Sequence, residues 1–111
     1  MGKHYPLTRP RRLRSSSFSR RLTRETELTA NDLIYPLFIM EGENNSEAVA
    51  SMPGVNRLTV DLMIEEARTA ASLGIPLIAL FPVVPVDKKT DDGREAFNPN
   101  GLIQTAVRAL K

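Results

Sequence analysis

The 111-residue chain contains no cysteine and no tryptophan, and its only histidine is His4. Without cysteine, neither a disulfide framework nor a thiolate metal site can form. His4 has no neighbour at a metal-ligand spacing, and no second histidine is available for a Ser/His/Asp triad. The glycines form no phosphate-cradling motif. These absences exclude most of the cofactor-binding and nucleophilic sites that can be recognised from short motifs.

Long hydrophobic runs are also missing. No apolar stretch approaches the ~20 residues of a membrane span, and no signal-peptide core follows the basic N-terminus. Arginine and serine near the start are also features of organelle transit peptides, but the arginines continue without a break into the following segment. We therefore expect a cytoplasmic protein without membrane contact.

Acidic residues are absent from the first 24 positions, which hold eight basic ones. The remainder has seven basic and thirteen acidic residues, a balance of −6. Such an arm fits either nucleic acid or the acidic surface of a neighbouring subunit. Because only Tyr5 and Phe18 interleave the arginines, stacking on single strands has little support. We expect subunit docking by residues 1–31, without nucleic acid, through Arg9, Arg11, Arg12, Arg14, Arg20 and Arg21.

Residues 32–111 have the pattern of a parallel α/β protein. Residues 34–40 (IYPLFIM) and 77–81 (LIALF) are apolar runs of strand length on either side of an amphipathic helix. Strands of this kind belong to parallel sheets with both faces covered, as in barrels and doubly wound folds. Pro36 cannot donate a ladder hydrogen bond, so we place it near a strand start, a bulge or an open edge.

The helix is expected over residues 60–73. Thr59 is the predicted N-cap, and Gly74 and Pro76 end the helix. Its buried face is predicted to contain six apolar residues, namely Val60, Met63, Ile64, Ala67, Ala70 and Ala71.

Two polar segments follow the two strands. Residues 41–52 are predicted to be a long loop that ends in a type II turn at Pro53 and Gly54. Residues 87–96 are a charged loop, after which Asn98 and Pro99 are expected to open a second helix. That helix has no stop signal before Lys111, and two strands are too few for a barrel or a doubly wound fold. We therefore expect the chain to be the beginning of a larger protein.

The charged loop contains the other candidates for chemistry. Its four carboxylates, Asp87, Asp91, Asp92 and Glu95, lack the spacing of a calcium loop. Lys88 and Lys89 are too close to aspartates to be desolvated Schiff-base amines. We expect this segment to be a solvated loop.

Several motifs resemble one family. Residues 9–14 (RPRRLR), 18–26 (FSRRLTRET) and 28–42 (LTANDLIYPLFIMEG) resemble the N-terminal part of porphobilinogen synthases, also called delta-aminolevulinic acid dehydratases. Residues 51–61 (SMPGVNRLTVD), 73–85 (LGIPLIALFPVVP) and 95–102 (EAFNPNGL) continue the resemblance in the same order. It covers the chain from about residue 9 onward.

The resemblance implies an extended arm followed by the first β/α units of a truncated (β/α)8 barrel. It implies a lyase that condenses two 5-aminolevulinate molecules to porphobilinogen, uses zinc or magnesium, and assembles into octamers through the arm. The family's catalytic lysines and metal ligands lie beyond the matched region. We therefore expect no catalytic, cofactor-binding or metal residue in this chain, and no activity from it alone. The alternative is a small non-catalytic protein that binds nucleic acid or an acidic partner through its arm.

Overall fold

The computed structural model describes residue 2 and residues 4–111, so Lys3 of the basic arm lies outside the described residues. The described helices are α1 (Ser17–Thr23), α2 (Val60–Ser72) and α3 (Leu102–Leu110), and the strands are β1 (Ile34–Met40), β2 (Ser46–Ala48), β3 (Asn56–Thr59) and β4 (Leu77–Pro82). Short 3-10 turns occur at η1 (Arg12–Arg14), η2 (Ala30–Asp32), η3 (Val86–Lys88) and η4 (Arg94–Phe97).

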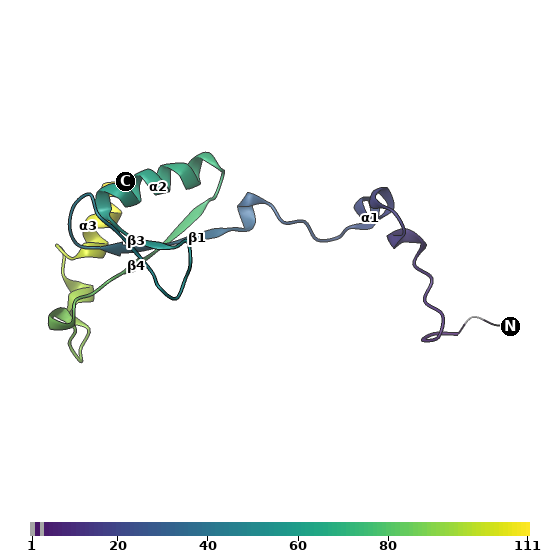
Figure 1. Cartoon of the computed structure of the whole chain (residues 1–111), viewed down its shortest axis with the longest axis horizontal. Coiled ribbons are helices and arrows are strands. Elements are labelled where there is room, and N and C mark those ends of the chain that lie inside the picture. The colour runs from purple at the N-terminus through teal and green to yellow at the C-terminus, as the bar shows by residue number, and fades with distance from the viewer. Residues whose placement is uncertain (1, 3) are drawn as a thin grey trace.

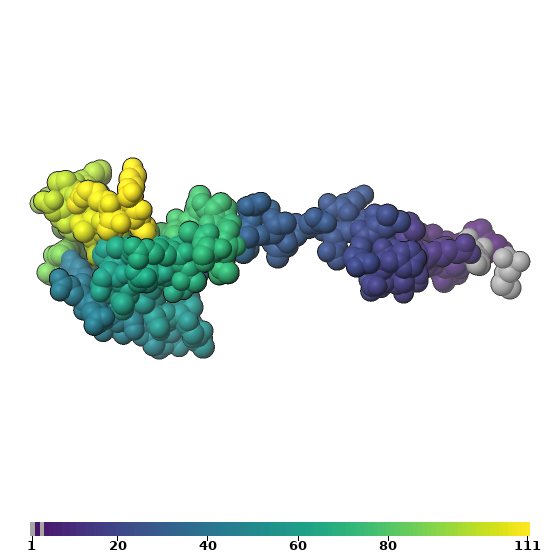
Figure 2. Space-filling model, turned by 90° about the horizontal axis from the view of Figure 1, so that it is seen from above, coloured from purple at the N-terminus to yellow at the C-terminus, as the bar shows by residue number. Residues whose placement is uncertain are grey.

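An arm extends away from a small α/β body, which gives the molecule extents of 75 × 34 × 26 Å (Figures 1 and 2). Helix α1 packs chiefly against η1 within the arm itself. Phe18 and Leu22, four residues apart, lie on one side of this helix.

The body contains one four-stranded sheet in the order β2-β3-β1-β4. Strand β1 is parallel to both neighbours, whereas β2 is antiparallel to β3. The bounds predicted for β1 are confirmed, and β4 extends one residue further than expected. The long loop predicted over residues 41–52 is wrong in part, because it contains β2. Strands β2 and β3 are short and mostly polar, so they lack the apolar alternation that reveals longer strands.

Pro36 lies beside an open edge of β1, which is one of the three positions predicted for it. Along β1, strand β3 pairs only with Phe38–Met40, whereas β4 pairs with the longer stretch from Ile34 to Ile39. The Val83 N–H donates to the Ile39 carbonyl at 2.8 Å, so Ile39 directs its backbone groups toward β4. Alternation then directs the backbone of Pro36 toward the opposite, unpaired edge, where no N–H is needed.

Both long helices of the body lie on the same face of the sheet. The core cluster joins Leu37 and Ile39 of β1 to Met63 and Ala67 of α2 and to Ala106 of α3. Helices α2 and α3 also pack against each other (Figure 1). On the opposite face, Phe38 and Phe81 pair at 5.6 Å between ring centroids, and Phe81 remains 49% exposed. The residues of this chain therefore cover one face of the sheet and leave the other open.

Helix α2 matches its predicted bounds closely, but the predicted cap and the burial of one predicted core residue differ. Thr59 is the N-cap residue, yet its hydroxyl donates to the Asn45 carbonyl and accepts from the Asn45 N–H, each at 3.1 Å. The hydroxyl therefore joins β3 to the preceding loop rather than capping α2. Ala71 is exposed, so the buried face of α2 is narrower than predicted.

Helix α3 begins three residues later than the sequence pattern suggested. Asn98 instead closes a turn, where its side-chain oxygen accepts from the Asn100 N–H at 2.9 Å. Gly101 is the N-cap and is buried. A Cβ at Gly101 would lie 2.6 Å from Gln104 Oε1 and 3.1 Å from the Asn98 carbonyl, so a side chain there would require Gln104 to move and would crowd the turn.

Candidate functional site

The segments that follow β1 and β4 meet at the carboxyl end of the sheet. Glu41 follows β1 directly, and Lys88 lies in η3 after β4. The Lys88 ammonium donates to Glu41 Oε1 and forms an ion pair with it. Carboxyl ends of parallel strands are where α/β folds place their binding sites. The structure therefore brings two charged side chains, 47 residues apart in sequence, to the position where a functional site is expected.

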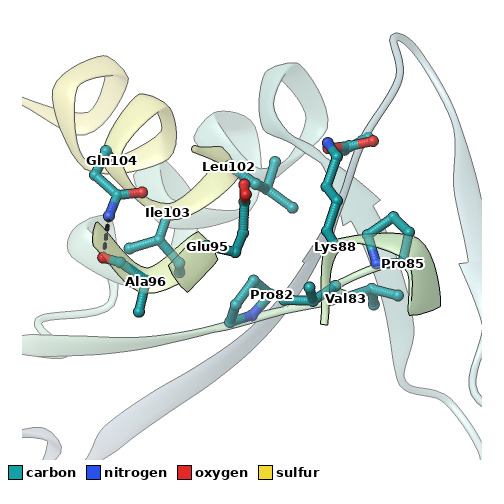
Figure 3. A pocket seen from close by; sticks show the side chains of 11 residues that line it. Pro82, Val83, Pro85, Lys88, Glu95, Ala96, Leu102, Ile103 and Gln104 are labelled. Atoms are coloured by element: carbon teal, nitrogen blue, oxygen red, sulfur yellow. Dashed lines mark hydrogen bonds and ion pairs between the residues drawn. The ribbon is translucent and has the colours of Figure 1, made fainter. Parts of the chain in front are cut away.

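A cavity of about 200 Å³ lies beneath this ion pair. Figure 3 shows Pro82 and Val83 along one wall, Leu102 and Ile103 on the facing helix, and Lys88 and Glu95 between them. Its walls are therefore mainly apolar, and its charged groups gather where the two loops meet. Such a space can hold a small apolar group, but the described residues provide few polar groups to orient a ligand.

The two lysines of the charged loop do not have the surroundings of a nucleophilic amine. The hydrogen bond to Glu41 raises the pKa of Lys88 above its ordinary value, and the nearby Glu95 and Asp87 carboxylates act in the same direction. A Schiff-base lysine requires the opposite shift, since its neutral form is the nucleophile. Lys89 is exposed.

The four loop carboxylates do not form a metal site. Asp92 accepts from Thr90 Oγ1 at 2.6 Å and pairs with Arg94 at 3.1 Å, and these two contacts lower its pKa. Glu95 accepts from Asn98 Nδ2. Across residue 2 and residues 4–111, no three His, Cys, Asp or Glu side chains gather to hold an ion. The donor set of this loop therefore does not fit the zinc or magnesium that the family resemblance implies.

The far end of the charged loop is attached to α3. Gln104 Nε2 donates to the Ala96 carbonyl at 2.8 Å, and Arg108 Nη1 donates to the Pro99 carbonyl at 2.8 Å. Reasoning from the sequence missed the roles of Glu41 and Gln104. Glu41 carried only one weak signal, its position directly after a strand, and Gln104 carried none.

The arm arginines lie apart from the carboxyl end of the sheet. The Arg9 guanidinium lies over the Tyr5 ring, 5.4 Å from its centroid, and Arg20 Nη1 donates to the Arg14 carbonyl at 3.0 Å. All four ion pairs found among the described residues lie in the body. Arg11, Arg12 and Arg21 are exposed. The structure thus presents the six candidate docking residues on an arm that is separate from the cavity.

The strand–helix–strand unit, with a helix following the last strand, defines the body as an α/β protein with a parallel sheet core. The family model for delta-aminolevulinic acid dehydratase matches residues 7–111. The chain therefore belongs to the delta-aminolevulinic acid dehydratase family, which consists of lyases of heme and tetrapyrrole biosynthesis. The similarities give no support to the alternative of a nucleic-acid-binding protein.

Two curated relatives illustrate the match. The chain is 52% identical to the delta-aminolevulinic acid dehydratase of Bradyrhizobium diazoefficiens over 93% of its own length and 29% of that relative. It is 49% identical to the enzyme of Synechococcus elongatus over 96% of its own length and 32% of that relative. The chain thus spans about a third of the length of the curated relatives that it matches.

A solved structure shows the same arrangement. The delta-aminolevulinic acid dehydratase (porphobilinogen synthase) of Toxoplasma gondii, crystallised with its reaction product porphobilinogen, matches 94% of this chain and 29% of that chain. The TM-score is 0.87 and the sequence identity is 39%. The arm and the four-stranded body therefore correspond to part of a porphobilinogen synthase. No helix among the described residues has the length and apolar character needed to cross a membrane.

Proposed function

We propose that this chain is the N-terminal part of a porphobilinogen synthase and that its sheet begins a (β/α)8 barrel. The observation that carries the barrel is the position of α2 and α3 on one face of the sheet, in a single core cluster with β1. A doubly wound sheet has helices on both faces, whereas a barrel has all of them outside. On this proposal the bare face with Phe38 and Phe81 is the barrel interior. A barrel of this kind needs roughly 250 residues.

The proposed reaction is the condensation of two 5-aminolevulinate molecules to porphobilinogen with loss of water. The catalytic lysines and the ligands of zinc or magnesium would be supplied by residues beyond these 111. The raised pKa of Lys88 supports this assignment, because that amine stays protonated. We therefore propose that the chain is inactive alone.

The arm would attach this part to a neighbouring subunit in a homo-oligomer of the cytoplasm. Its exposed Arg11, Arg12 and Arg21 support that role, since residues 25–111 carry a balance of −6. A basic arm and an acidic body are complementary between copies.

Complementation tests the proposed activity. The chain is mixed with the remaining two thirds of the Bradyrhizobium relative, and porphobilinogen is measured colorimetrically. We expect no product from the chain alone, and product above a boiled control when both pieces are present. Lys89→Met should leave that product unchanged, because Lys89 is exposed and lies outside the proposed catalytic set.

Borohydride reduction in the presence of 5-aminolevulinate tests the assignment of the lysines. A Schiff base on Lys88 or Lys89 would contradict the proposal, as would turnover by the 111-residue chain alone. Failure of the mixture to form product, with both pieces soluble and associated, would contradict the assignment of this chain to the enzyme's N-terminal part.

A further inference from the structure

The Glu41–Lys88 pair differs from the other ion pairs of the described residues in what it connects. Two of the others join positions two or three residues apart, Arg94 with Asp92 and Arg68 with Glu65. A third joins Arg57 to Glu47 across β2 and β3, which already share ladder hydrogen bonds. Only the Glu41–Lys88 pair, among described residues, connects segments that have no shared secondary structure.

Among the described residues, the segment formed by residues 84–95 has no other polar attachment between its two ends. Its first end is fixed by the Val83 N–H to the Ile39 carbonyl, and its last end by Gln104 to the Ala96 carbonyl. Within residues 84–95 as described, the remaining hydrogen bonds are local, such as those of Lys88 to Pro85 and Gly93 to Thr90.

Apolar contacts hold the start of the segment, where Val84 and Pro85 are half-buried against the cavity, and add little beyond it. Val86 is 83% exposed at one side of the segment, and Phe97 just beyond its other end is 81% exposed. A segment of this length with local bonds alone would open at little free-energy cost. The ion pair is therefore the contact that can determine whether the segment stays over the cavity.

We propose that the Glu41–Lys88 ion pair is a latch that holds residues 84–95 across the carboxyl ends of β1 and β4 and thereby covers the cavity between β4 and α3. Opening the latch exposes the apolar wall formed by Val83, Leu102 and Ile103. This assignment concerns the motion of one segment and does not depend on whether the chain belongs to an active enzyme.

Amide hydrogen exchange on the 111-residue chain, followed by mass spectrometry or NMR, tests the latch. The reporting amides are those of Lys88, Lys89, Gly93 and Ala96, which donate the segment's internal bonds. Glu41→Gln and Lys88→Met each remove one charge and keep much of the side chain's bulk. Glu47→Gln is the matched control, because the pair of Glu47 and Arg57 has similar exposure, 60% and 36% against 49% and 38% for Glu41 and Lys88.

Exposed ion pairs contribute modestly, so we expect Glu41→Gln to accelerate exchange of these amides by about two- to fivefold. Lys88→Met should give the same acceleration, and the double variant should add nothing further, because each change removes the same contact. Sodium chloride at high concentration should accelerate exchange in the parent chain and leave the variants unchanged. Glu47→Gln should leave these amides as in the parent, and protection in β1 and β4 should be equal in all variants.

Three outcomes would overturn the latch. The first is unchanged exchange of the segment in Glu41→Gln. The second is additive acceleration in the double variant, which would mean that the two residues act separately. The third is exchange of residues 84–95 at free-peptide rates in the parent chain, since a latch that holds the segment must slow it.

Discussion

The arm and the body use their apolar residues in opposite ways. In the arm, Phe18 and Leu22 lie on one side of α1, where they are 66% and 79% exposed. In the body, Ile39 and Met63 are fully buried, and α2 and α3 share one cluster with β1. The arm thus has local structure without a core of its own, whereas the body has a core on one side of its sheet.

The arm and the body also differ in whether their charged side chains form ion pairs. The first 24 residues have no acid, and the described arginines among them have no ion-pair partner among the described residues. The body's charges form pairs with one another, and one pair joins two loops. A short helix such as α1 is marginal in water without packing, whereas α2 packs against β1, β3 and α3 of the body.

Replacing one buried residue should produce the largest contrast between the regions. Ile39→Ala removes a fully buried side chain at the centre of the cluster and should lower the free energy of unfolding by about 2–5 kcal/mol. Leu22→Ala in the arm should change it by less than about 0.5 kcal/mol, because that side chain is exposed. Urea titration of the helical circular dichroism signal measures both. An equal loss in the two variants would show that the arm packs on the body in solution.

The second contrast concerns assembly. In a full-length family protein carrying this arm, Arg11, Arg12 and Arg14 are replaced together by alanine. Exposed ion pairs contribute ~0.2–1 kcal/mol each, so subunit association should weaken by about 1–3 kcal/mol while barrel folding is kept. Light scattering and circular dichroism measure the two properties. Arg68→Ala is the control in the body, because its pair with Glu65 lies within α2. Unchanged assembly with loss of secondary structure would contradict the docking role.

The smallest contrast depends on pH. Asp61 lies in the first turn of α2, where the Thr59 hydroxyl and the Asn44 N–H lower its pKa below the ordinary value of 3.8. A lowered pKa gives stability that is present above pH 3.8 and lost as the pH falls through the folded-state value. Helicity of α2 should therefore fall below about pH 4, and Asp61→Asn should remove part of that dependence.

Asp92→Asn is the matched control for this titration. The pKa of Asp92 is also lowered, by Thr90 and Arg94, but its contacts lie in the charged loop and not at a helix terminus. We expect the α2 signal of Asp92→Asn to follow the parent chain through the whole acid range. A parent-like acid transition in Asp61→Asn would show that Asp61 does not stabilise the helix.

Elements with a strong local pattern were predictable from the sequence. Strand β1 and helix α2 have the expected bounds to within a residue, since their apolar periods and the breakers Gly74 and Pro76 are local signals. The turn at Pro53 and Gly54 is also confirmed, with Gly54 at φ +83° and the Val55 N–H donating to the Met52 carbonyl at 3.0 Å. The division of the chain near residue 31 stays a prediction.

Elements that depend on distant residues were not predictable in this way. Strands β2 and β3 exist because they pair with each other and β3 pairs with β1, and their own residues give no alternating pattern. The shift of the α3 start arises from the Asn98 turn and the close packing of Gly101. The Glu41–Lys88 pair joins residues 47 positions apart, and no spacing rule connects them.

The sequence by itself determined the basic arm, the parallel α/β class, the principal strands and helix, and the family, because these follow from composition, local period and ordered motifs. Only the tertiary structure decided which face of the sheet is covered, where β1 is left unpaired beside Pro36, and which charges meet at the carboxyl ends of β1 and β4. The physical reason is that burial and ion pairing depend on distances in space. Those distances are set by strand pairing and helix packing between residues that are far apart along the chain.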